Sequence, residues 1–212
     1  MILTILGAPG AGKGTLAHEI SKALSIPAIS TGGLLRDEIA SGSEMGVYID
    51  SLISKGNFVP DDLMVKILSE RLKKDDCKDG YILDGFPRNT DQASHLLDYG
   101  INLTRALLLK VSDDVIIDRL SGRRECVSCR QTYHITQNPP KKEGICDLCG
   151  SALRTRPDDK ADIIKKRLQI YHKETEPLIE FFKKRNLLSE VDGTGSVSQT
   201  KKSAFEILGV EL

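Results

Sequence analysis

Residues 1–15 read Met1-Ile-Leu-Thr-Ile-Leu-Gly-Ala-Pro-Gly-Ala-Gly-Lys-Gly-Thr15 and join a short apolar run to a glycine-rich loop. The run from Ile2 to Leu6 is typical of a buried parallel strand, and an amphipathic helical pattern follows the loop. The loop has the pattern Gly-x-x-x-x-Gly-Lys, which binds phosphate when a strand precedes it and a helix follows. A chance glycine-rich turn would not have both neighbours in register. The segment therefore predicts binding of a nucleoside triphosphate.

This loop brings three sources of positive potential together. Its glycines let backbone N–H groups converge on phosphate oxygens, the helix N-terminus adds a partial positive charge, and Lys13 adds a full one. The usual pattern has Ser or Thr directly after the lysine, whereas here Gly14 intervenes before Thr15.

Length and composition narrow the class of protein. A chain of 212 residues has room for one α/β domain with a good core and small insertions. Its 30 Lys and Arg balance 30 Asp and Glu, and Trp is absent, so neither net charge nor stacking surface favours nucleic acid. No run is long enough to span a bilayer, and the apolar N-terminus stops too early for a signal peptide. We expect a cytoplasmic enzyme with no nucleic-acid or membrane partner.

Apolar strands alternate with amphipathic helices along the chain. The expected strands are Ile2–Leu6, Pro27–Ser30, Tyr81–Asp84, Ala106–Val111 and Leu188–Val191. The expected helices are Thr15–Leu24, Thr31–Ser41, Met45–Ser54, Asp61–Lys73, Asn89–Tyr99, Ser112–Gly122, Lys160–Asn186 and Ser196–Leu208. Pro177 predicts a break near Thr175–Pro177 in the longest helix. The alternation predicts an α/β fold, with a five-stranded parallel sheet covered by helices on both faces.

Two segments depart from this alternation. Residues 30–59 give two helices with no strand between them, and residues 123–159 are rich in Gly, Pro, Cys and charge, with short extended pieces such as Gln131–Ile135. We interpret both as insertions at the carboxyl edge of the strands, where open α/β sheets bind ligands. Residues 1–29, 60–122 and 160–212 then form the core.

Four of the five cysteines form two Cys-x-x-Cys pairs separated by sixteen residues: Cys126, Cys129, Cys146 and Cys149, with Cys77 alone. In a chain without a secretory signal such pairs indicate metal rather than disulfides. The spacing matches a four-thiolate zinc site, whose closed shell makes the metal structural. A redox dithiol is the alternative, but one pair would suffice for it. A nucleic-acid finger is another, although no basic helix flanks the pairs.

Arginines concentrate around the second insertion: Arg119, Arg123, Arg124, Arg154, Arg156 and Arg167. Arg119 and Arg123 lie four apart and share a helix face. A solvated charged surface is the ordinary fate of arginine. Because arginine also makes planar bidentate contacts with phosphate, a set beside a phosphate loop favours phosphate binding.

Asp84 ends the third strand and precedes Gly85, beside the glycine loop. That place suits a carboxylate that holds Mg²⁺ through water, although it could also cap the turn. The four histidines have no ligand or dyad spacing. An alcohol acceptor would require a base, whereas an acceptor that is already an anion requires only cations to bring it up to the donor. The pattern favours a phosphorylated acceptor.

Taken together, these motifs resemble the adenylate kinase family, in its long-lid, zinc-containing type. The resemblance runs almost end to end, through Gly7-Ala-Pro-Gly-Ala-Gly-Lys-Gly-Thr15, Ser30-Thr31-Gly32 with Leu35-Arg36, Asp84-Gly-Phe-Pro-Arg88 with Gln92, Asp118-Arg-Leu-Ser-Gly-Arg-Arg124, Arg154-Thr-Arg156-Pro-Asp-Asp159, Arg167 and Val191-Asp-Gly-Thr194. It implies a P-loop core, a helical insertion at 30–59 that binds the monophosphate, and a zinc-ribbon lid at 123–159.

The resemblance also assigns roles to single residues. It implies ATP contacts at Gly10, Ala11, Gly12, Lys13, Gly14, Thr15, Arg119, Arg123, Thr132, Tyr133 and Gly195. It implies AMP contacts at Thr31, Arg36, Asn57, Phe58, Val59, Gly85, Phe86, Pro87, Arg88, Gln92, Arg156 and Arg167, with Gln92 reading the adenine. The catalytic set would be Lys13, Asp84, Arg88, Arg123, Arg156 and Arg167, with zinc on the four paired cysteines.

The implied reaction is MgATP plus AMP giving two ADP, catalysed by a monomer. Two positions depart from the family pattern, which often has Asp where this chain has Gly33 and Lys where it has Asn57. A UMP/CMP kinase is an alternative, although such enzymes have a short lid without cysteines. A GTP-using AMP kinase is a second alternative, and a nucleotide-gated nucleic-acid-binding zinc ribbon is a third, of a different class.

Overall fold

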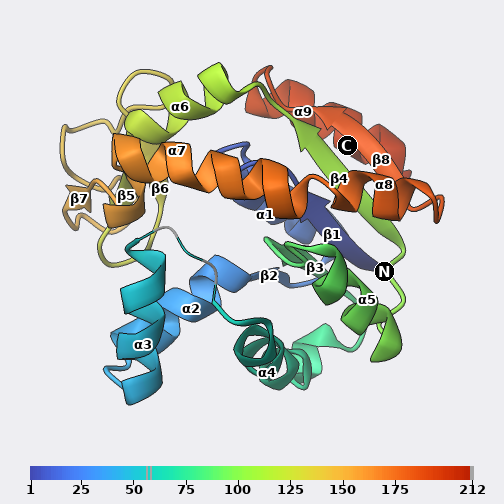
Figure 1. The fold of residues 1–212 in the computed structure, drawn as a ribbon. Coiled ribbons are helices and arrows are strands. Elements are labelled where there is room, and N and C mark those ends of the chain that lie inside the picture. Colours follow the sequence, from blue (N-terminus) through green and yellow to red (C-terminus); the bar gives the residue numbers. More distant parts are fainter. Residues whose placement is uncertain (56, 58, 211–212) are drawn as a thin grey trace.

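Within residues 1–55, 57 and 59–210, which the computed structural model describes, five parallel strands form the central sheet (Figure 1). The strands are β1 (Ile2–Leu6), β2 (Ala28–Ser30), β3 (Tyr81–Asp84), β4 (Arg105–Lys110) and β8 (Leu188–Asp192). Their order is β2-β3-β1-β4-β8. All five predicted strands are confirmed, each to within one residue at either end.

β1 lies at the centre of the sheet and pairs with β3 on one side and β4 on the other. Its side chains alternate between two cores: Leu3 and Ile5 pack on one face, and Leu6 packs on the other. A strand buried on both faces needs apolar residues at nearly every position, which is why the sequence signal of this strand is so clear.

Helices cover both faces of the sheet, as the alternation predicts. One core contains residues of α1 (Lys13–Leu24), α6 (Asp113–Ser121), α7 (Ala161–Ile170) and α9 (Val197–Leu208). The other contains residues of α4 (Asp61–Leu72), α5 (Thr90–Asp98) and α8 (Leu178–Lys183). Short 3-10 turns cover Asp75–Cys77 and Pro157–Asp159. Within the described residues, no helix is both long enough and apolar enough to cross a membrane.

The predicted break in the longest helix is confirmed. After α7 the chain makes a π-helical turn over Tyr171–Thr175, and α8 begins only after Pro177. Proline cannot donate the helical hydrogen bond, and the wider turn closes instead with the N–H of Glu176 on the carbonyl of Tyr171, at 2.9 Å. The wider turn brings Tyr171 and Thr175 to the cavity described below.

Residues 30–59 contain α2 (Thr31–Ala40) and α3 (Glu44–Ile53) with no strand between them, as expected. Each helix begins at a serine cap: Ser30 accepts the N–H of Gly33, and Ser43 accepts that of Gly46. The two helices cross closely at Gly46, where a Cβ would collide with the carbonyl oxygen of Glu38.

The second insertion contains a three-stranded antiparallel sheet of its own: β5 (Arg123–Cys126) between β6 (Thr132–His134) and β7 (Leu153–Arg154). Its buried core consists of Cys126, Tyr133 and Cys146, with Leu153 packed against them. So small a core cannot stabilise a lobe without a further link such as a metal. The sequence pointed only to the extended piece around β6, because β5 and β7 are too short to show a period.

We predict that Gly46→Ala destabilises the protein, because the added methyl meets backbone rather than a movable side chain. Overpacking costs roughly 1–3 kcal/mol, which exceeds the gain of about 1 kcal/mol in helix propensity. Urea denaturation measures the change in the free energy of unfolding. Ser51→Ala, at an exposed position of the same helix, is the control and should change little. Equal stability of the two variants would contradict the close crossing.

Candidate active site

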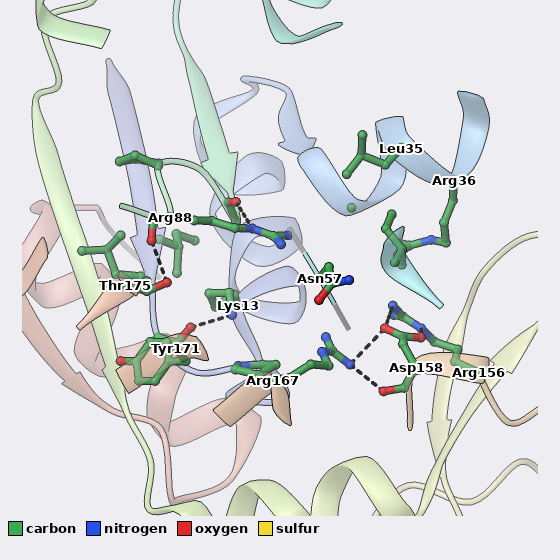
Figure 2. Close-up of a pocket in the computed structure, with 18 residues that line it drawn as sticks. Lys13, Leu35, Arg36, Asn57, Arg88, Arg156, Asp158, Arg167, Tyr171 and Thr175 are labelled. Carbon is green, nitrogen blue, oxygen red and sulfur yellow. Dashed lines mark hydrogen bonds and ion pairs between the residues drawn. The ribbon is translucent and has the colours of Figure 1, made fainter. Parts of the chain in front are cut away.

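A cavity of about 140 Å³ lies at the carboxyl edge of the sheet (Figure 2). Five cationic side chains line it: Lys13, Arg36, Arg88, Arg156 and Arg167. They come from α1, α2, the loop after β3, the lid and α7. Asp158 is the one carboxylate among the described lining residues, so the cations outnumber it, and the arrangement is that of a polyanion site.

Lys13 is the first residue of α1, and Gly12 before it has the left-handed φ of 99° that ends the loop. Its Nζ donates to the carbonyls of Gly7 and Ala8, at 2.8 and 2.9 Å. Burial lowers the pKa of Lys13 to about 8, against the opposing charge of Asp84. Neutral carbonyls thus stand where a phosphate would stabilise the ammonium far better.

Asp84 lies against the glycine loop, as the sequence predicts. A Cβ on Gly14 would lie 3.2 Å from Asp84 Oδ2. The carboxylate at the end of β3 therefore faces the first turn of α1, where the phosphates of a nucleotide would lie. A glycine at this position leaves room between the helix and the carboxylate.

Arg36 is a largely buried cation with an unpaired hydrogen-bond donor. Burial lowers its pKa to about 10, with the charge of Arg156 acting in the same direction. Among the described residues its Nε is the one buried side-chain nitrogen or oxygen without a hydrogen-bond partner. Buried polar groups are nearly always satisfied, so an unpaired guanidinium N–H on a residue that lines the cavity suits a site for anions.

The loop that carries Arg88 is held from three sides. Thr31 of α2 donates to the carbonyl of Gly85 at 3.0 Å, and Thr175 of the π-helical turn donates to that of Arg88 at 2.7 Å. Gln92 of α5 accepts the N–H of Arg88 at 2.7 Å. Arg88 itself donates from Nε to the carbonyl of Gly85 at 2.8 Å. Burial lowers the pKa of this guanidinium.

Two adjacent carboxylates organise the remaining arginines. Arg123 makes a bidentate pair with Asp159, at 2.7 and 2.5 Å. Arg156 makes one with Asp158, at 3.0 and 2.7 Å, and Arg167 lies 2.9 Å from the same carboxylate. Burial opposes ionisation of Asp158, but the charges of Arg167 and Arg156 outweigh it and lower its pKa to about 2. The arginines are therefore fixed in place without a ligand.

Sequence reasoning assigned no role to Asp158 and Asp159, although they follow Arg156 almost directly. It also treated six arginines as one set, and it expected Arg119 and Arg123 on one helix face; that expectation is wrong, because α6 ends at Ser121 and Arg123 begins β5. The structure brings three of the six together and leaves Arg124 donating to the carbonyls of Ser121 and Arg123, outside the cavity lining. Arg154 lies exposed on β7.

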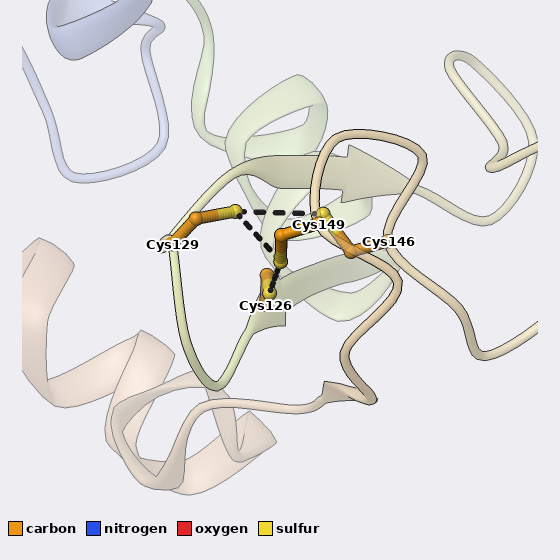
Figure 3. Close-up of side chains that lie close together, drawn as sticks. All are labelled: Cys126, Cys129, Cys146 and Cys149. Atoms are coloured by element: carbon orange, nitrogen blue, oxygen red, sulfur yellow. Dashed lines mark hydrogen bonds between the residues drawn. The ribbon is translucent and has the colours of Figure 1, made fainter.

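The four paired cysteines meet in the lid (Figure 3). The sulfur atoms of Cys126, Cys129, Cys146 and Cys149 all lie within 4.8 Å of one another. Among the described residues this is the one group of three or more His, Cys, Asp or Glu close enough to share a metal ion. Gly150 follows the second pair with φ of 74°, and Cys77 lies apart, buried in the core. Four thiolates at this spacing are the donor set that zinc prefers.

Comparison with known proteins gives matches to one named family. The adenylate kinase family model matches residues 5–187. An adenylate kinase of Caldicellulosiruptor saccharolyticus is 46% identical over 215 residues, covering 100% of both chains, and one of Clostridium beijerinckii is 46% identical over 213 residues, covering 99% of both. The chain belongs to the adenylate kinase family. It is a nucleoside monophosphate kinase, for which ATP and AMP give two ADP, and adenylate kinases use Mg²⁺ with ATP.

The residues expected near the donor nucleotide lie around the glycine loop and α6. Arg119 donates to the carbonyls of Ala11 and Thr194, both at 3.4 Å. A groove beside it includes Gly195. In the lid, Thr132 is exposed on β6, whereas Tyr133 is buried and its hydroxyl accepts the N–H of Asp147 at 2.7 Å.

The residues expected around the adenine of AMP are placed less uniformly. Asn57 and Pro87 line the cavity, Val59 and Phe86 are buried and do not line it, and Phe58 lies outside the described residues. Asn57 Oδ1 accepts from Lys166 of α7 at 2.7 Å, a partner that sequence reasoning missed.

Gln92 does not line the cavity. Its carbonyl is used by the N–H of Arg88, and its amide donates to Asp61 at the start of α4. Its expected role in reading adenine stays a prediction, which would require these hydrogen bonds to be exchanged or shared.

We predict that ATP binding takes up close to one proton at pH 9 and little at pH 7. A pKa near 8 leaves Lys13 mostly neutral at pH 9, and the phosphate charge restores the ammonium. The terminal phosphate of ATP, with a pKa of about 6, is fully ionised at pH 9 and contributes no uptake. Calorimetry in two buffers of different ionisation enthalpy measures it. Lys13→Arg is the control, because a guanidinium stays charged and should bind without uptake. Equal uptake by both proteins would exclude Lys13 as its source.

Proposed function

We propose that AMP binds in the cavity, that the phosphates of ATP lie on the glycine loop, and that the cations between them carry the phosphoryl transfer. The convergence of five cations from five parts of the chain, with Arg36 Nε unpaired, supports this most strongly. The catalytic residues are Lys13, Asp84, Arg88, Arg123, Arg156 and Arg167.

The reaction requires no general base. At neutral pH the acceptor phosphate is largely ionised, so the attacking oxygen has no proton to lose. The bond from the γ-phosphorus to the bridging oxygen of ATP breaks as the bond to the AMP oxygen forms, and both products are ADP. Charge spreads over the transferred group, and fixed cations stabilise it without reorganising. Lys13 and Arg88 reach this point from the core, and Arg123, Arg156 and Arg167 from the lid and α7.

Magnesium fits beside Asp84. Asp84 would hold the ion, because its carboxylate faces the first turn of α1 and carboxylates bind Mg²⁺ directly or through water. Bound there, the ion neutralises the phosphate charge. Gly33 brings no carboxylate to this region; its N–H is used by the cap Ser30.

The core and the two insertions have different roles in this proposal. The core comprises residues 1–29, 60–122 and 160–212 and carries the glycine loop. Residues 30–59 bind AMP through α2 and the segment after α3, and residues 123–159 form a zinc-stapled lid over the ATP phosphates. When both insertions close, they exclude water, which would otherwise accept the phosphoryl group. A cytoplasmic monomer without nucleic-acid or membrane partners completes the proposal.

The rival functions are less well supported. A UMP/CMP-type kinase would have a short lid without cysteines, whereas this lid contains four. A nucleic-acid-binding ribbon would not explain why the lid contributes Arg156 to a cavity that Lys13 and Arg88 of the core also line. A GTP donor is compatible with the same cations, and the relatives named adenylate kinase favour ATP.

We predict that Arg156→Ala lowers kcat by a factor of at least about 10³, by analogy with other arginines that stabilise a transferring phosphoryl group. Arg154→Ala is the matched control: it removes the same charge two residues away, on the exposed strand β7, and should leave kcat nearly unchanged. A coupled assay of ADP formation from ATP and AMP measures both. Equal loss in the two variants would show that only the overall charge of the lid matters.

We predict about one zinc per chain, bound by the four paired cysteines. Structural zinc in small ribbons contributes apparent binding energies of roughly 10–16 kcal/mol, so Cys146→Ser should lose the metal and lower the thermal stability of the lid. Cys77→Ser is the control and should keep the zinc. Metal analysis and thermal denaturation provide the measurements. A protein free of zinc, with native stability and four reactive thiols, would contradict the assignment.

A further inference from the structure

The two cysteine turns of the lid have the same backbone structure. In the first, the N–H of Arg130 donates to the carbonyl of Cys126 at 3.2 Å; in the second, that of Gly150 donates to Cys146 at 2.9 Å. The N–H of each first cysteine then donates to the carbonyl of the residue five positions later: Cys126 to Gln131 at 2.9 Å, and Cys146 to Ser151 at 2.8 Å. Arg130 and Gly150 therefore occupy equivalent positions.

Both of these positions require left-handed backbone. φ is 62° at Arg130 and 74° at Gly150. Glycine adopts this conformation without steric cost, whereas a residue with a Cβ and a long side chain does not. The second turn thus has the residue that the backbone favours, and the first has one that the backbone disfavours. A non-glycine residue held at such a position points to a role for its side chain.

That side chain reaches the other insertion. Arg130 Nη2 lies 2.6 Å from Asp37 Oδ1 on α2. Figure 1 shows α2 and the lid strands on the same side of the molecule, with no strand of the core between them. Asp37 directly follows Arg36, whose guanidinium lines the cavity, so the pair ties the lid to the helix that carries an AMP contact.

We propose that Arg130 is a positioning residue whose ion pair with Asp37 couples closure of the lid over ATP to closure of the α2–α3 insertion over AMP. The inference rests on the proposed function, which assigns one nucleotide to each insertion. The pair forms only when both insertions face each other, so each bound nucleotide favours the arrangement that the other requires. Such coupling is reciprocal: ATP raises the affinity for AMP by the same factor as AMP raises the affinity for ATP.

The size of the effect follows from exposure. The side chains of Arg130 and Asp37 are 37% and 65% exposed, so the pair is screened by solvent and salt. An exposed ion pair corresponds to roughly a two- to five-fold change in an equilibrium constant. Loss of the pair should therefore reduce the coupling by that factor and leave each nucleotide's separate binding unchanged.

Arg130→Gly and Asp37→Asn test the proposal. AMP affinity is measured by calorimetry with and without saturating β,γ-methylene-ATP, which binds but cannot transfer its γ-phosphoryl group. Both variants should show the two- to five-fold loss of coupling, and both should raise the KM for AMP at saturating ATP more than they lower kcat. Raising the salt concentration should weaken coupling in the natural chain and have little effect in the variants.

Stability separates positioning from a structural role. Arg130→Gly supplies the residue that the left-handed position favours, so the lid should be at least as stable to heat, although coupling falls. A structural arginine would give a less stable lid instead. Arg130→Asp places like charges together and should reduce coupling further, and combining it with Asp37→Arg should restore it. Unchanged coupling in the single variants, or failure of the exchanged pair to restore it, overturns the proposal.

One more variant distinguishes failure of this inference from failure of the proposed function. Arg36→Ala should weaken AMP binding even without the ATP analogue, because it removes a direct contact. If it does so while Arg130→Gly leaves the coupling intact, the AMP site is supported and the proposed role of the Arg130–Asp37 ion pair is wrong. If Arg36→Ala leaves AMP binding unchanged, the assignment of the AMP site itself fails.

Discussion

The site depends on keeping five cations close together around a space that is ready for phosphate. Burial lowers the pKa of Lys13 to about 8 and that of Arg36 and Arg167 to about 10, so each of these charged groups is less favourable in the folded protein than in water. The negative charge of a bound polyphosphate would stabilise the charged forms of all three groups. Part of the binding energy of the nucleotide is therefore built into the folded protein, as fixed charge that needs no rearrangement.

Two carboxylates, those of Asp158 and Asp159, hold part of this cluster of cations in place in the absence of a ligand. Asp158 and Asp159 pair with Arg123, Arg156 and Arg167, and so fix their directions before nucleotide arrives. Arg36 has no such partner at Nε, and Lys13 has only carbonyls. The site thus separates arginines oriented by carboxylates, on the side of the cysteine-containing insertion, from Arg36 and Lys13, on the side of α2 and the glycine loop, which no carboxylate orients in this way. A carboxylate at every arginine would have cancelled the attraction for phosphate.

The local sequence pattern predicted the strands and the cysteine site well, but it did not predict which side chains distant in sequence contact one another. The strands were found because a strand buried on both faces is apolar throughout, and the cysteine site because its ligands are spaced within short turns. Gln92 was expected at the adenine, but its position beside Asp61 depends on two helices that meet only in the fold. The left-handed backbone at Arg130 is equally invisible in sequence, because arginine is not a residue that marks such a position. Partners distant in sequence have no signature in any one segment.

Asn57 differs from the residue expected at this position, and its hydrogen bond with Lys166, which is distant in the sequence, accounts for the difference. The resemblance led us to expect lysine there, and a lysine beside Lys166 would bring two ammonium groups together. Lys166 instead donates to Asn57 Oδ1 at 2.7 Å and to the carbonyl of Lys55 at 2.8 Å. The cation comes from α7, and position 57 supplies the acceptor. Because Lys166 precedes Arg167 on the same helix, α7 both binds the segment after α3 and contributes Arg167 to the cavity lining. Asn57 in place of lysine looks in the sequence like the loss of a positive charge. In the structure Lys166 of α7 provides that charge and donates the hydrogen bond to Asn57.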